Sequence, residues 1–396
     1  MARLRVAVCA DFPEEGWRSM DRVAAMLVDS LQRHHAATIQ ATLIVPGFVR
    51  RVTRVWPGRS RWPRQVDRIL NRLLDYPRYA TTISGDYDVF HVVDHSYSHL
   101  VHRLPAGRTI VTCHDLDAFR SILHPDAEPR TAPYRAMSRH IMAGLRQAAR
   151  LTCDTAAIRN ELLSHGLAAP DRVLVAPVGV GEPYSPSPDP AIDARAARLV
   201  GSAPGSIELL HVGSPVARKR IDLLLKFCGE LRRHVPELHL IRAGGAFTAE
   251  QQKLARDVGM QDHMSVLEFL DDRTLAAVYR RAAIVVQPSD REGFGLPLVE
   301  AMACGTPVIA TDLSVLREVG GTAVEYCAPG DQHAWTARLL ELLHERRDAP
   351  ERWAARREAG LARAARFTWQ QFAARLVDVY AQLAATSEPE LAVHTA

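Results

Sequence analysis

The sequence predicts an α/β protein made of two doubly wound domains, each a parallel sheet covered by helices. The chain has 396 residues, which is too long for one ordinary core and suits two domains. Apolar residues make up 47% and charged residues 24%, the balance of a globular protein with a packed interior. Short β-branched or apolar runs alternate with longer segments of helical period, which is typical of βαβ units.

The first half of the chain contains a series of strand-like runs. Each is rich in Val, Ile, Leu or Thr and is followed by a segment with apolar residues at helical spacing. The predicted strands cover residues 5–10, 39–46, 88–93, 109–114, 150–155 and 172–177. We therefore expect a Rossmann-like first domain over residues 1–185.

The same alternation returns in the second half. The predicted strands cover residues 207–213, 238–244, 264–270, 283–289, 307–312 and 322–328. The stretch "GVGEPYSPSPDPA" (179–191) is dense in Pro, Ser and Gly and predicts an exposed connection between the domains. We expect a second Rossmann-like domain over 192–365, a helix over 366–385 and a disordered tail over 386–396, which lacks periodicity.

Composition argues against a membrane-spanning or disulfide-bonded protein. No stretch approaches the roughly 20 uninterrupted apolar residues of a membrane span, and the N-terminal residues lack a long apolar signal core. The six cysteines are scattered and form no CxxC motif, so reduced core thiols are expected. These features predict a cytoplasmic protein, which could still work at the inner face of the membrane.

Positive charge is concentrated in residues 48–79. This segment has nine arginines and two aspartates, a net charge of +7, which leaves −3 for the remainder of a chain whose total is +4. Trp56 and Trp62 lie among the arginines, and such a mixture suits a lipid headgroup surface or an acidic partner. An arginine-rich solvated loop and helix is an equal alternative. No nucleic-acid-binding motif accompanies the segment, so no nucleic acid is expected.

The stretch "REGFGLPLVE" (291–300) follows the predicted strand 283–289. Pro297 marks a helix start, and the glycines before it allow a close approach of the backbone to an anion such as a diphosphate. Glu292 in the loop and Glu300 in the helix can both face one crevice and accept hydrogen bonds from vicinal sugar hydroxyls. The alternative is a glutamate in solvent and a glutamate in a surface salt bridge.

A run of three cations precedes the helix that is predicted to begin near Ile221. The strand 207–213 ends at Gly213, and Arg218, Lys219 and Arg220 follow it. Cations at a helix N-terminus oppose the helix dipole, and a nearby anion such as phosphate would reverse that penalty. Solvated cations on a loop are the alternative.

Together these two stretches resemble the donor half of the retaining family 4 glycosyltransferases of GT-B fold. That family carries a Glu-x7-Glu motif, matched by Glu292 and Glu300, and a basic pair, matched by Arg218 and Lys219. The order and spacing agree over about residues 205 to 330, and "FTWQQFAARLVDVY" resembles the closing helix that crosses back to the N-terminal domain. The resemblance implies two Rossmann-like domains that face each other across a cleft.

The resemblance also implies roles for individual residues. Glu300 would hold the ribose, Glu292 and the following backbone the donor sugar, and Arg218 with Lys219 the diphosphate. In the first half, "TIVTCHDL" resembles a family strand whose terminal histidine, His114 here, lies beside the transferred sugar. The family's first loop has a Gly-Gly pair, of which this sequence keeps only Gly16. The expected catalytic residues are His114, Glu292, Arg218 and Lys219, and the expected donor-binding residues are Gly16, Gly213, Arg218, Lys219, Glu292, Gly293, Phe294, Gly295, Leu296 and Glu300.

Two patterns could be taken for metal sites. Asp115-Leu116-Asp117 has the form of a metal-binding Asp-x-Asp, but a GT-B enzyme needs no metal, so a loop or helix start is expected. Four histidines at 91, 95, 99 and 102 could suggest zinc on a helix, but His91 lies in a predicted strand, which breaks that geometry. We expect no metal and no cofactor. Neither GxGxxG nor a P-loop motif occurs, which argues against dinucleotide redox chemistry and P-loop phosphoryl transfer.

The sequence thus predicts a retaining glycosyltransferase that moves a hexose from a nucleoside-diphosphate sugar to a saccharide or a lipid-linked acceptor. A role in cell-surface polysaccharide or glycolipid synthesis is expected, with peripheral membrane contact through residues 48–79. The alternatives are another GT-B activity, such as a sugar-nucleotide epimerase or a phosphorylase, and a non-catalytic scaffold at the membrane surface.

Overall fold

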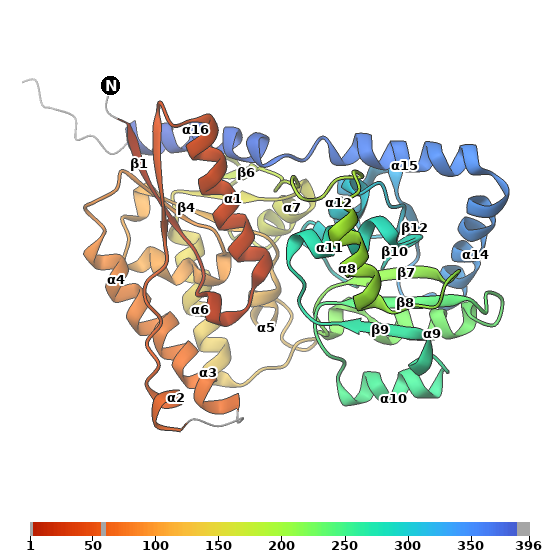
Figure 1. Cartoon of the computed structure of the whole chain (residues 1–396). Helices are drawn as coiled ribbons and strands as arrows, with labels where there is room; N and C mark the ends of the chain where they lie inside the picture. Colours follow the sequence, from red (N-terminus) through yellow and green to blue (C-terminus); the bar gives the residue numbers. More distant parts are fainter. Residues whose placement is uncertain (1–2, 57–60, 386–396) are drawn as a thin grey trace, which may run out of the picture. The chain divides into compact units, whose positions relative to one another are not determined.

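The computed structural model describes residues 3–56 and 61–385, and these form two compact units (Figure 1). Unit 1 comprises Met1–Gly179 with Trp369–Ala396, and unit 2 comprises Val180–Thr368. The division thus falls at the start of the predicted connection 179–191, and the last helix belongs with the N-terminal unit. The tail predicted over 386–396 lies outside the described residues.

Unit 1 is built on a parallel sheet of six strands in the order β2-β1-β3-β4-β5-β6. Every strand predicted in the first half overlaps an observed one, and the ends differ by at most two residues, as is usual for element boundaries. The strands are β1 (Leu4–Cys9), β2 (Ile39–Ile44), β3 (Val89–Val92), β4 (Thr109–Cys113), β5 (Arg150–Cys153) and β6 (Val173–Val175).

The helices of unit 1 pack their apolar faces on this sheet. α16 (Trp369–Ala385) packs on α1, β1 and β3, which fixes the end of the described chain on the N-terminal unit. The Tyr380 hydroxyl of α16 and the His91 Nδ1 of β3 share a hydrogen bond at 2.6 Å. The other α-helices are α1 (Arg18–His34), α2 (Val52–Val55), α3 (Arg61–Leu70), α4 (Tyr76–Thr82), α5 (Arg120–Leu123), α6 (Ala132–Gln147) and α7 (Ala156–Ser164).

Unit 2 repeats the plan with a second parallel sheet of six strands, in the order β12-β11-β10-β7-β8-β9. All the strands predicted in the second half are present, again a few residues shorter than expected. They are β7 (Ile207–Val212), β8 (Leu238–Ala243), β9 (Met264–Leu267), β10 (Ile284–Gln287), β11 (Val308–Thr311) and β12 (Glu325–Cys327).

The core of unit 2 lies between this sheet and its helices. Leu209, Leu240 and Ile309 from three strands are fully or almost fully buried, and the rings of Phe227 and Trp335 stack with centroids 5.1 Å apart. Burial of such side chains supplies most of the folding free energy. The helices are α8 (Pro190–Val200), α9 (Ile221–Leu231), α10 (Ala249–Asp257), α11 (Asp272–Arg281), α12 (Leu296–Ala303), α13 (Ser314–Gly320), α14 (Gln332–Asp348) and α15 (Pro350–Ala364).

The two ends of unit 2 are joined to each other. Val180 pairs with Thr368 in an isolated parallel bridge, and the Val180 N–H donates to the Phe367 carbonyl at 2.9 Å. The Pro-rich connection therefore begins as paired backbone and not as the fully exposed linker that composition suggests. The chain enters and leaves unit 2 at neighbouring positions.

The strand orders locate the places where ligands bind in such sheets. In both units the order reverses once, between β1 and β3 in unit 1 and between β7 and β10 in unit 2. Helices leave to opposite faces on the two sides of a reversal, which opens a crevice at the carboxyl ends of those strands. Functional side chains should therefore be sought in the loops that follow these strands.

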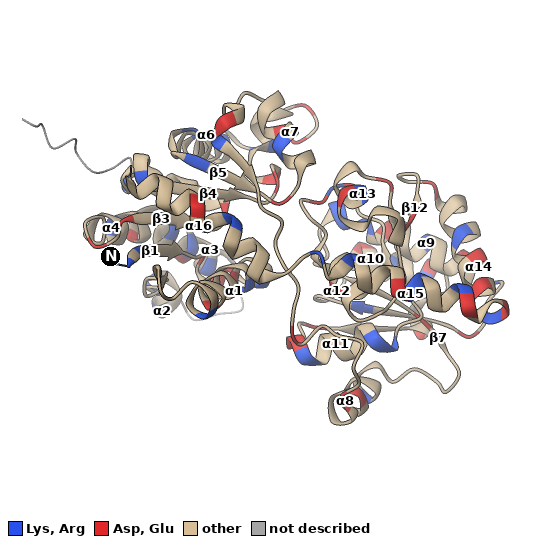
Figure 2. Cartoon of the chain, turned by 90° about the horizontal axis from the view of Figure 1, so that it is seen from above, with Lys and Arg blue, Asp and Glu red and all other residues tan. Residues whose placement is uncertain are grey.

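Three further features of the chain concern its cysteines, its helices and its surface charges. All six cysteines are buried free thiols, as predicted. Within residues 3–56 and 61–385, no helix is both long and apolar enough to cross a bilayer. Figure 2 shows both signs of charge on α14 and α15, where Arg356 pairs with Glu325 and with Glu345.

Candidate active site

The loops after β7 and β10 bring three of the predicted site residues together in unit 2. The Lys219 Nζ lies 2.5 Å from the Glu292 Oε1, and the Arg218 Nη1 lies 3.4 Å from the Glu292 Oε2. The Gln287 amide, at the end of β10, donates to the same Oε1 at 2.9 Å. Sequence reasoning missed Gln287, although its position at the end of a strand beside the reversal could have indicated it. We call Arg218, Lys219, Gln287 and Glu292 the charged cluster.

The electrostatics of the charged cluster keep Glu292 ionised. Burial would raise the pKa of the Glu292 carboxyl, but the nearby Lys219 and Arg218 lower it to about 2. Lys219 is itself buried, 7% exposed, so this ion pair is largely shielded from water. The two cations are thus already in place around a buried carboxylate. They can exchange that carboxylate for the anion of a ligand.

The alternative of solvated cations before α9 is wrong. Arg220, with φ of 49°, forms ion pairs at 2.9 Å with both Asp222 and Asp290. Together with Glu292, these carboxylates supply the anions that the helix dipole and the three cations require. The chain thus provides anions of its own beside these cations, and the binding of a ligand phosphate at Arg218 and Lys219 stays a prediction.

The glycine-rich loop before α12 has the predicted form. Gly295 is the N-cap of α12 with φ of 92°, and a Cβ at this position would lie 2.7 Å from the Leu316 Cδ2. Only glycine fits that backbone and that space. Gly293 lies in the same loop and Leu296 is the first residue of the helix. Phe294 is 4% exposed and packs edge-on against Phe367, so its side chain belongs to the core and only its backbone is left for a ligand.

Glu300 lies inside α12 and is 3% exposed. The Tyr279 hydroxyl, from α11, donates to the Glu300 Oε2 at 2.8 Å. Tyr279 is therefore a further residue that sequence reasoning missed, because nothing in its local pattern distinguishes it from a core tyrosine. Its hydrogen bond fixes the carboxylate that is predicted to hold the ribose.

Behind the charged cluster lie two buried basic side chains. His211 in β7 and Arg242 in β8 are register partners, 1% and 0% exposed. Burial lowers the pKa of His211 well below its usual value, and Arg242 and Lys219 lower it further, so the imidazole is neutral. A Cβ built on Gly213 would lie 3.5 Å from the His211 Cε1 and 3.4 Å from the Lys219 stem, which places both side chains against the end of β7.

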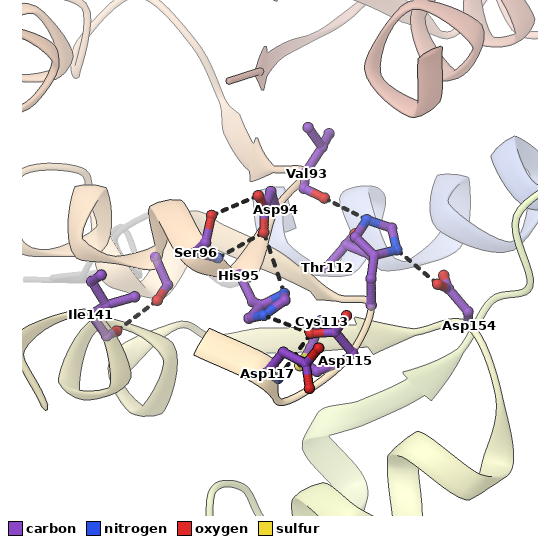
Figure 3. A network of polar contacts seen from close by, with 12 residues as sticks. Val93, Asp94, His95, Ser96, Thr112, Cys113, Asp115, Asp117, Ile141 and Asp154 are labelled. Carbon is purple, nitrogen blue, oxygen red and sulfur yellow. Dashed lines mark hydrogen bonds and ion pairs between the residues drawn. The ribbon is translucent and has the colours of Figure 1, made fainter. Parts of the chain in front are cut away.

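In unit 1 the predicted His114 directly follows β4, and both of its ring nitrogens are hydrogen-bonded. Its Nδ1 lies 2.7 Å from the Asp154 Oδ2, and its Nε2 lies 2.8 Å from the Val93 carbonyl (Figure 3). Burial would lower the pKa of His114, but Asp154 and Asp94 raise it to about 9. The ring is therefore an imidazolium that donates to both partners, and its orientation is fixed.

Further polar groups surround His114 at the strand ends of unit 1. Asp94 accepts hydrogen bonds from the Ser96 N–H at 2.8 Å and the Ser96 hydroxyl at 2.6 Å, and His95 lies 3.3 Å from Asp94 and 3.5 Å from Asp115 (Figure 3). Asp11 follows β1, is 1% exposed, and has a pKa raised by burial and by the Asp94 carboxylate. Asp11 after β1 and Asp94 after β3 therefore lie where the strand order of the sheet reverses. We call Asp11, Asp94, His114 and Asp154 the strand-end cluster.

Gly16 has no comparable surroundings. It is exposed at the end of the 3-10 turn Pro13–Glu15, with φ of 76°. A Cβ at Gly16 would meet no atom within 4 Å, and its N–H bonds to the Pro13 carbonyl at 3.0 Å. Its predicted contact with the donor phosphates stays a prediction.

The two patterns that resemble metal sites have structural roles. The Asp115 carboxylate accepts the Asp117 N–H at 2.9 Å at the start of a 3-10 turn, as a loop or helix start requires. His91 lies in β3 and bonds to Thr112 and Tyr380, while His95, His99 and His102 lie in the following 3-10 helix. In the described part of the chain, no three His, Cys, Asp or Glu side chains are placed to hold a metal ion.

Comparison with known proteins identifies the family. Residues 20–181 match the family model Glycosyltransferase Family 4, and residues 198–359 match Glycosyl transferases group 1. D-inositol 3-phosphate glycosyltransferase 1 of Catenulispora acidiphila is 31% identical over 339 residues, which are 80% of this chain and 78% of that protein. A second such enzyme of that species is 38% identical over 206 residues, 48% of this chain and 47% of that protein. The chain spans about half the length of several curated relatives that it matches.

Solved structures share the fold at low identity. Sucrose-phosphate synthase from Thermosynechococcus elongatus superposes with a TM-score of 0.75 at 20% identity, covering 97% of this chain and 100% of that one. Anabaena Alr3699/HepE in complex with UDP-glucose superposes with a TM-score of 0.70 at 14% identity, covering 96% of this chain and 100% of that one. The superpositions show that the chain has the GT-B fold. Because residues 20–181 and 198–359 match the two family models and a relative aligns over 80% of the chain, the chain belongs to the group 1 and family 4 glycosyltransferases.

Proposed function

We propose that the protein transfers a hexose, with retention of the anomeric configuration and without a metal ion, from a nucleoside-diphosphate sugar to an acceptor. The observation that carries this proposal is the charged cluster, in which Lys219 and Arg218 converge on the buried Glu292 beside the N-terminus of α12. A helix N-terminus and two cations suit a diphosphate. A structural neighbour solved with UDP-glucose supports a nucleotide-sugar donor.

The charged cluster can change partners when a donor binds. The two phosphates would take over Lys219 and Arg218, which now pair with Glu292. The freed carboxylate oxygens would accept hydrogen bonds from sugar hydroxyls, with Gln287 keeping Glu292 in place. As the glycosidic bond breaks, the cations stabilise the negative charge that grows on the leaving diphosphate.

Retention follows from attack on the face that the diphosphate leaves. The acceptor hydroxyl approaches that face and gives its proton to the departing phosphate, so no protein nucleophile is required. In this proposal Glu300, held by Tyr279, positions the ribose, and the cationic His114 presents its fixed ring at the edge of the unit 1 sheet. Exact positioning of the donor then supplies much of the rate enhancement.

The acceptor in this proposal is a saccharide or a lipid-linked sugar, as in polysaccharide or glycolipid synthesis. The enzyme would act in the cytoplasm and contact the membrane surface through residues 48–79. Arg50, Arg54, Arg64 and Arg78 in that segment make no ion pair among the described residues, and their exposed side chains support an attraction to anionic lipids.

A donor screen tests the proposal. UDP-, GDP-, ADP- and dTDP-sugars are added to the full chain, and a donor at 100 times its dissociation constant should stabilise it by about 2.7 kcal/mol. The stabilising donor is then supplied with candidate acceptors in the presence of EDTA, and the anomeric configuration of the product is read by NMR. Inversion, a requirement for metal, or release of an epimerised nucleotide sugar would each contradict the proposal. Glu292→Gln should abolish both the shift and the product.

A further inference from the structure

We propose that a pocket in unit 1, enclosed by α2, α3 and the loops that follow β1 and β2, binds the phosphate-bearing headgroup of an anionic phospholipid in a bilayer. The proposal rests on the membrane contact of the proposed function and deepens it by naming the site and the class of lipid. It concerns a region of unit 1 that contributes none of the residues of the charged cluster or the strand-end cluster.

The pocket has the size and lining of a small-molecule site. Its volume is about 490 Å³, and its walls include Arg50, Arg64 and Arg68 together with the aromatic rings of Phe48 and Trp56. Ligand pockets typically measure about 300 to 1000 Å³. Guanidinium groups present fixed forks of donors that match phosphate oxygens. Three arginines around one hollow therefore indicate an anionic ligand with at least one phosphate.

Two carboxylates also line the pocket, and only one competes for the arginines. Asp67 accepts the N–H groups of Val52 at 2.8 Å and Thr53 at 3.0 Å and the Thr53 hydroxyl at 2.6 Å. Burial would raise the pKa of Asp67, but these hydrogen bonds lower it to about 2. These hydrogen bonds hold the Asp67 carboxylate against the N-terminus of α2, and Arg68 pairs with Glu15 at 3.7 Å. The exposed Glu14 is then the remaining carboxylate beside Arg50 and Arg64.

Buried hydrogen bonds hold the walls of the pocket in place. Asn71 is fully buried, accepts the Val49 N–H at 2.7 Å, and donates to the Val49 carbonyl at 2.8 Å and to the Asp67 carbonyl at 2.7 Å. Asn71 opens a single π-helical turn, Asn71–Asp75, between α3 and α4, and such turns are frequent at functional sites. The segment that carries Arg50 is therefore fastened to the helix that carries Arg64.

The surface around the pocket is apolar as well as basic. Trp56 is 62% exposed and Trp62 52% exposed, and their ring centroids lie 6.1 Å apart. Val55 next to Trp56 is 67% exposed, and Ile69 on α3 is 46% exposed. Tryptophan rings and aliphatic side chains beside arginines are the composition of a helix that lies in the interfacial layer of a bilayer. A free phosphorylated metabolite would not explain this exposed apolar rim.

The arginines of this region also differ from those on unit 2. On α14 and α15, Arg338 and Arg356 form ion pairs with Glu325, Glu341 or Glu345. In the described part of residues 48–79, no ion pair involves Arg50 or Arg64, and Arg68 reaches only Glu15, at 3.7 Å. The guanidinium groups of Arg50 and Arg64 are therefore not held by a carboxylate within the described residues.

Vesicle binding by the full chain tests the pocket. Phosphatidylcholine vesicles with and without phosphatidylglycerol are sedimented with the wild type, with Arg50→Gln/Arg64→Gln and with Arg54→Gln/Arg78→Gln. The control pair removes the same charge from exposed positions of the same segment that do not line the pocket. Diffuse attraction alone predicts equal losses, about fivefold for each arginine. We expect the pocket pair to lose about tenfold more affinity than the control pair.

The outcomes separate the proposal from its rivals. Equal losses in the two double variants, or equal binding to vesicles without phosphatidylglycerol, overturn the pocket. Saturable stabilisation by glycerol 1-phosphate without vesicle binding also overturns it, because the ligand would then be a free phosphate ester. Trp56→Ser should weaken vesicle binding and leave the midpoint temperature of thermal unfolding unchanged. No sugar nucleotide is present in these measurements, so failure of the proposed transferase activity is scored separately from failure of the pocket.

Discussion

The two sheets of this protein end in polar clusters of opposite design. In unit 2 the charged cluster pairs Lys219 and Arg218 with one buried carboxylate, Glu292. In unit 1 the strand-end cluster sets Asp11 close to Asp94, and burial together with the Asp94 carboxylate raises the pKa of Asp11. Cations that can exchange an anion suit a diphosphate, whereas neighbouring carboxyl groups suit hydroxyl groups. The same fold thus gathers two cations around one carboxylate in unit 2 and two carboxyl groups around one histidine in unit 1.

The largest effect should come from removing a cation of unit 2. Lys219→Gln should lower the transfer rate about 100- to 1000-fold, because a preorganised donor to the leaving diphosphate is lost. Steady-state kinetics with the donor found in the screen measure this. Lys226→Gln, at an exposed position of α9, is the matched control and should keep the rate. A Lys219→Gln rate within about threefold of the wild type would remove the charged cluster from the chemistry.

Removal of the shared carboxylate should show how strongly unit 2 depends on its ion pairs. Glu292→Gln leaves the buried Lys219 without a carboxylate and should lower the free energy of unfolding by about 3 kcal/mol. Urea unfolding at pH 7 measures the loss. The exposed Glu358→Gln, on α15, should change the free energy by less than about 0.5 kcal/mol. Similar values for the two variants would mean that the ion pairs add nothing to folding.

In unit 1 the corresponding test is a pH dependence. The pKa of His114 is about 9 in the folded chain and about 6.5 when unfolded. Its contribution to stability is therefore complete below pH 6.5 and is lost as the pH rises through 9. The stability difference between the wild type and His114→Gln should shrink over that window by at most about 1.4 kcal/mol per pH unit. Denaturant unfolding from pH 6 to 10 measures it, with His344→Gln as the control for an exposed histidine. A constant difference would mean that His114 is neutral.

The smallest effect concerns the loop that shapes the charged cluster. Gly295 and Gly330 have φ of 92° and 74°, but only at Gly295 would a Cβ meet another atom too closely, the Leu316 Cδ2 at 2.7 Å. Gly295→Ala should therefore cost about 1 kcal/mol more than Gly330→Ala. Thermal and denaturant unfolding of both variants measure this difference. Equal costs would show that Leu316 moves aside and that the loop tolerates a side chain.

The contrast between the clusters also explains what could be read from the sequence. Strand positions follow from local apolar runs, so every predicted strand overlaps an observed one. Arg218, Lys219 and Glu292 lie in short distinctive stretches, and they were predicted. Their direct pairing was not, because a sequence shows which groups flank a strand but not which of them reach each other.

The strand-end cluster of unit 1 was largely out of reach of sequence reasoning. Asp11, Asp94 and Asp154 follow three different strands, with no fixed spacing between them and ordinary residues around each. Only the order of strands in the sheet brings them near His114, and that order depends on long-range packing. Arg242 and His211 were missed for the related reason that buried basic residues look like surface ones in a sequence.

The backbone bridge between Val180 and Thr368 has a consequence for engineering. Because the first and last residues of unit 2 are adjacent, unit 2 has the topology of a domain inserted into unit 1. A gene that joins codon 179 to codon 369 through a short spacer would encode unit 1 without a broken sheet, and codons 180–368 would encode unit 2 as a continuous piece. Unit 2 could then be exchanged between relatives by swapping one uninterrupted DNA fragment.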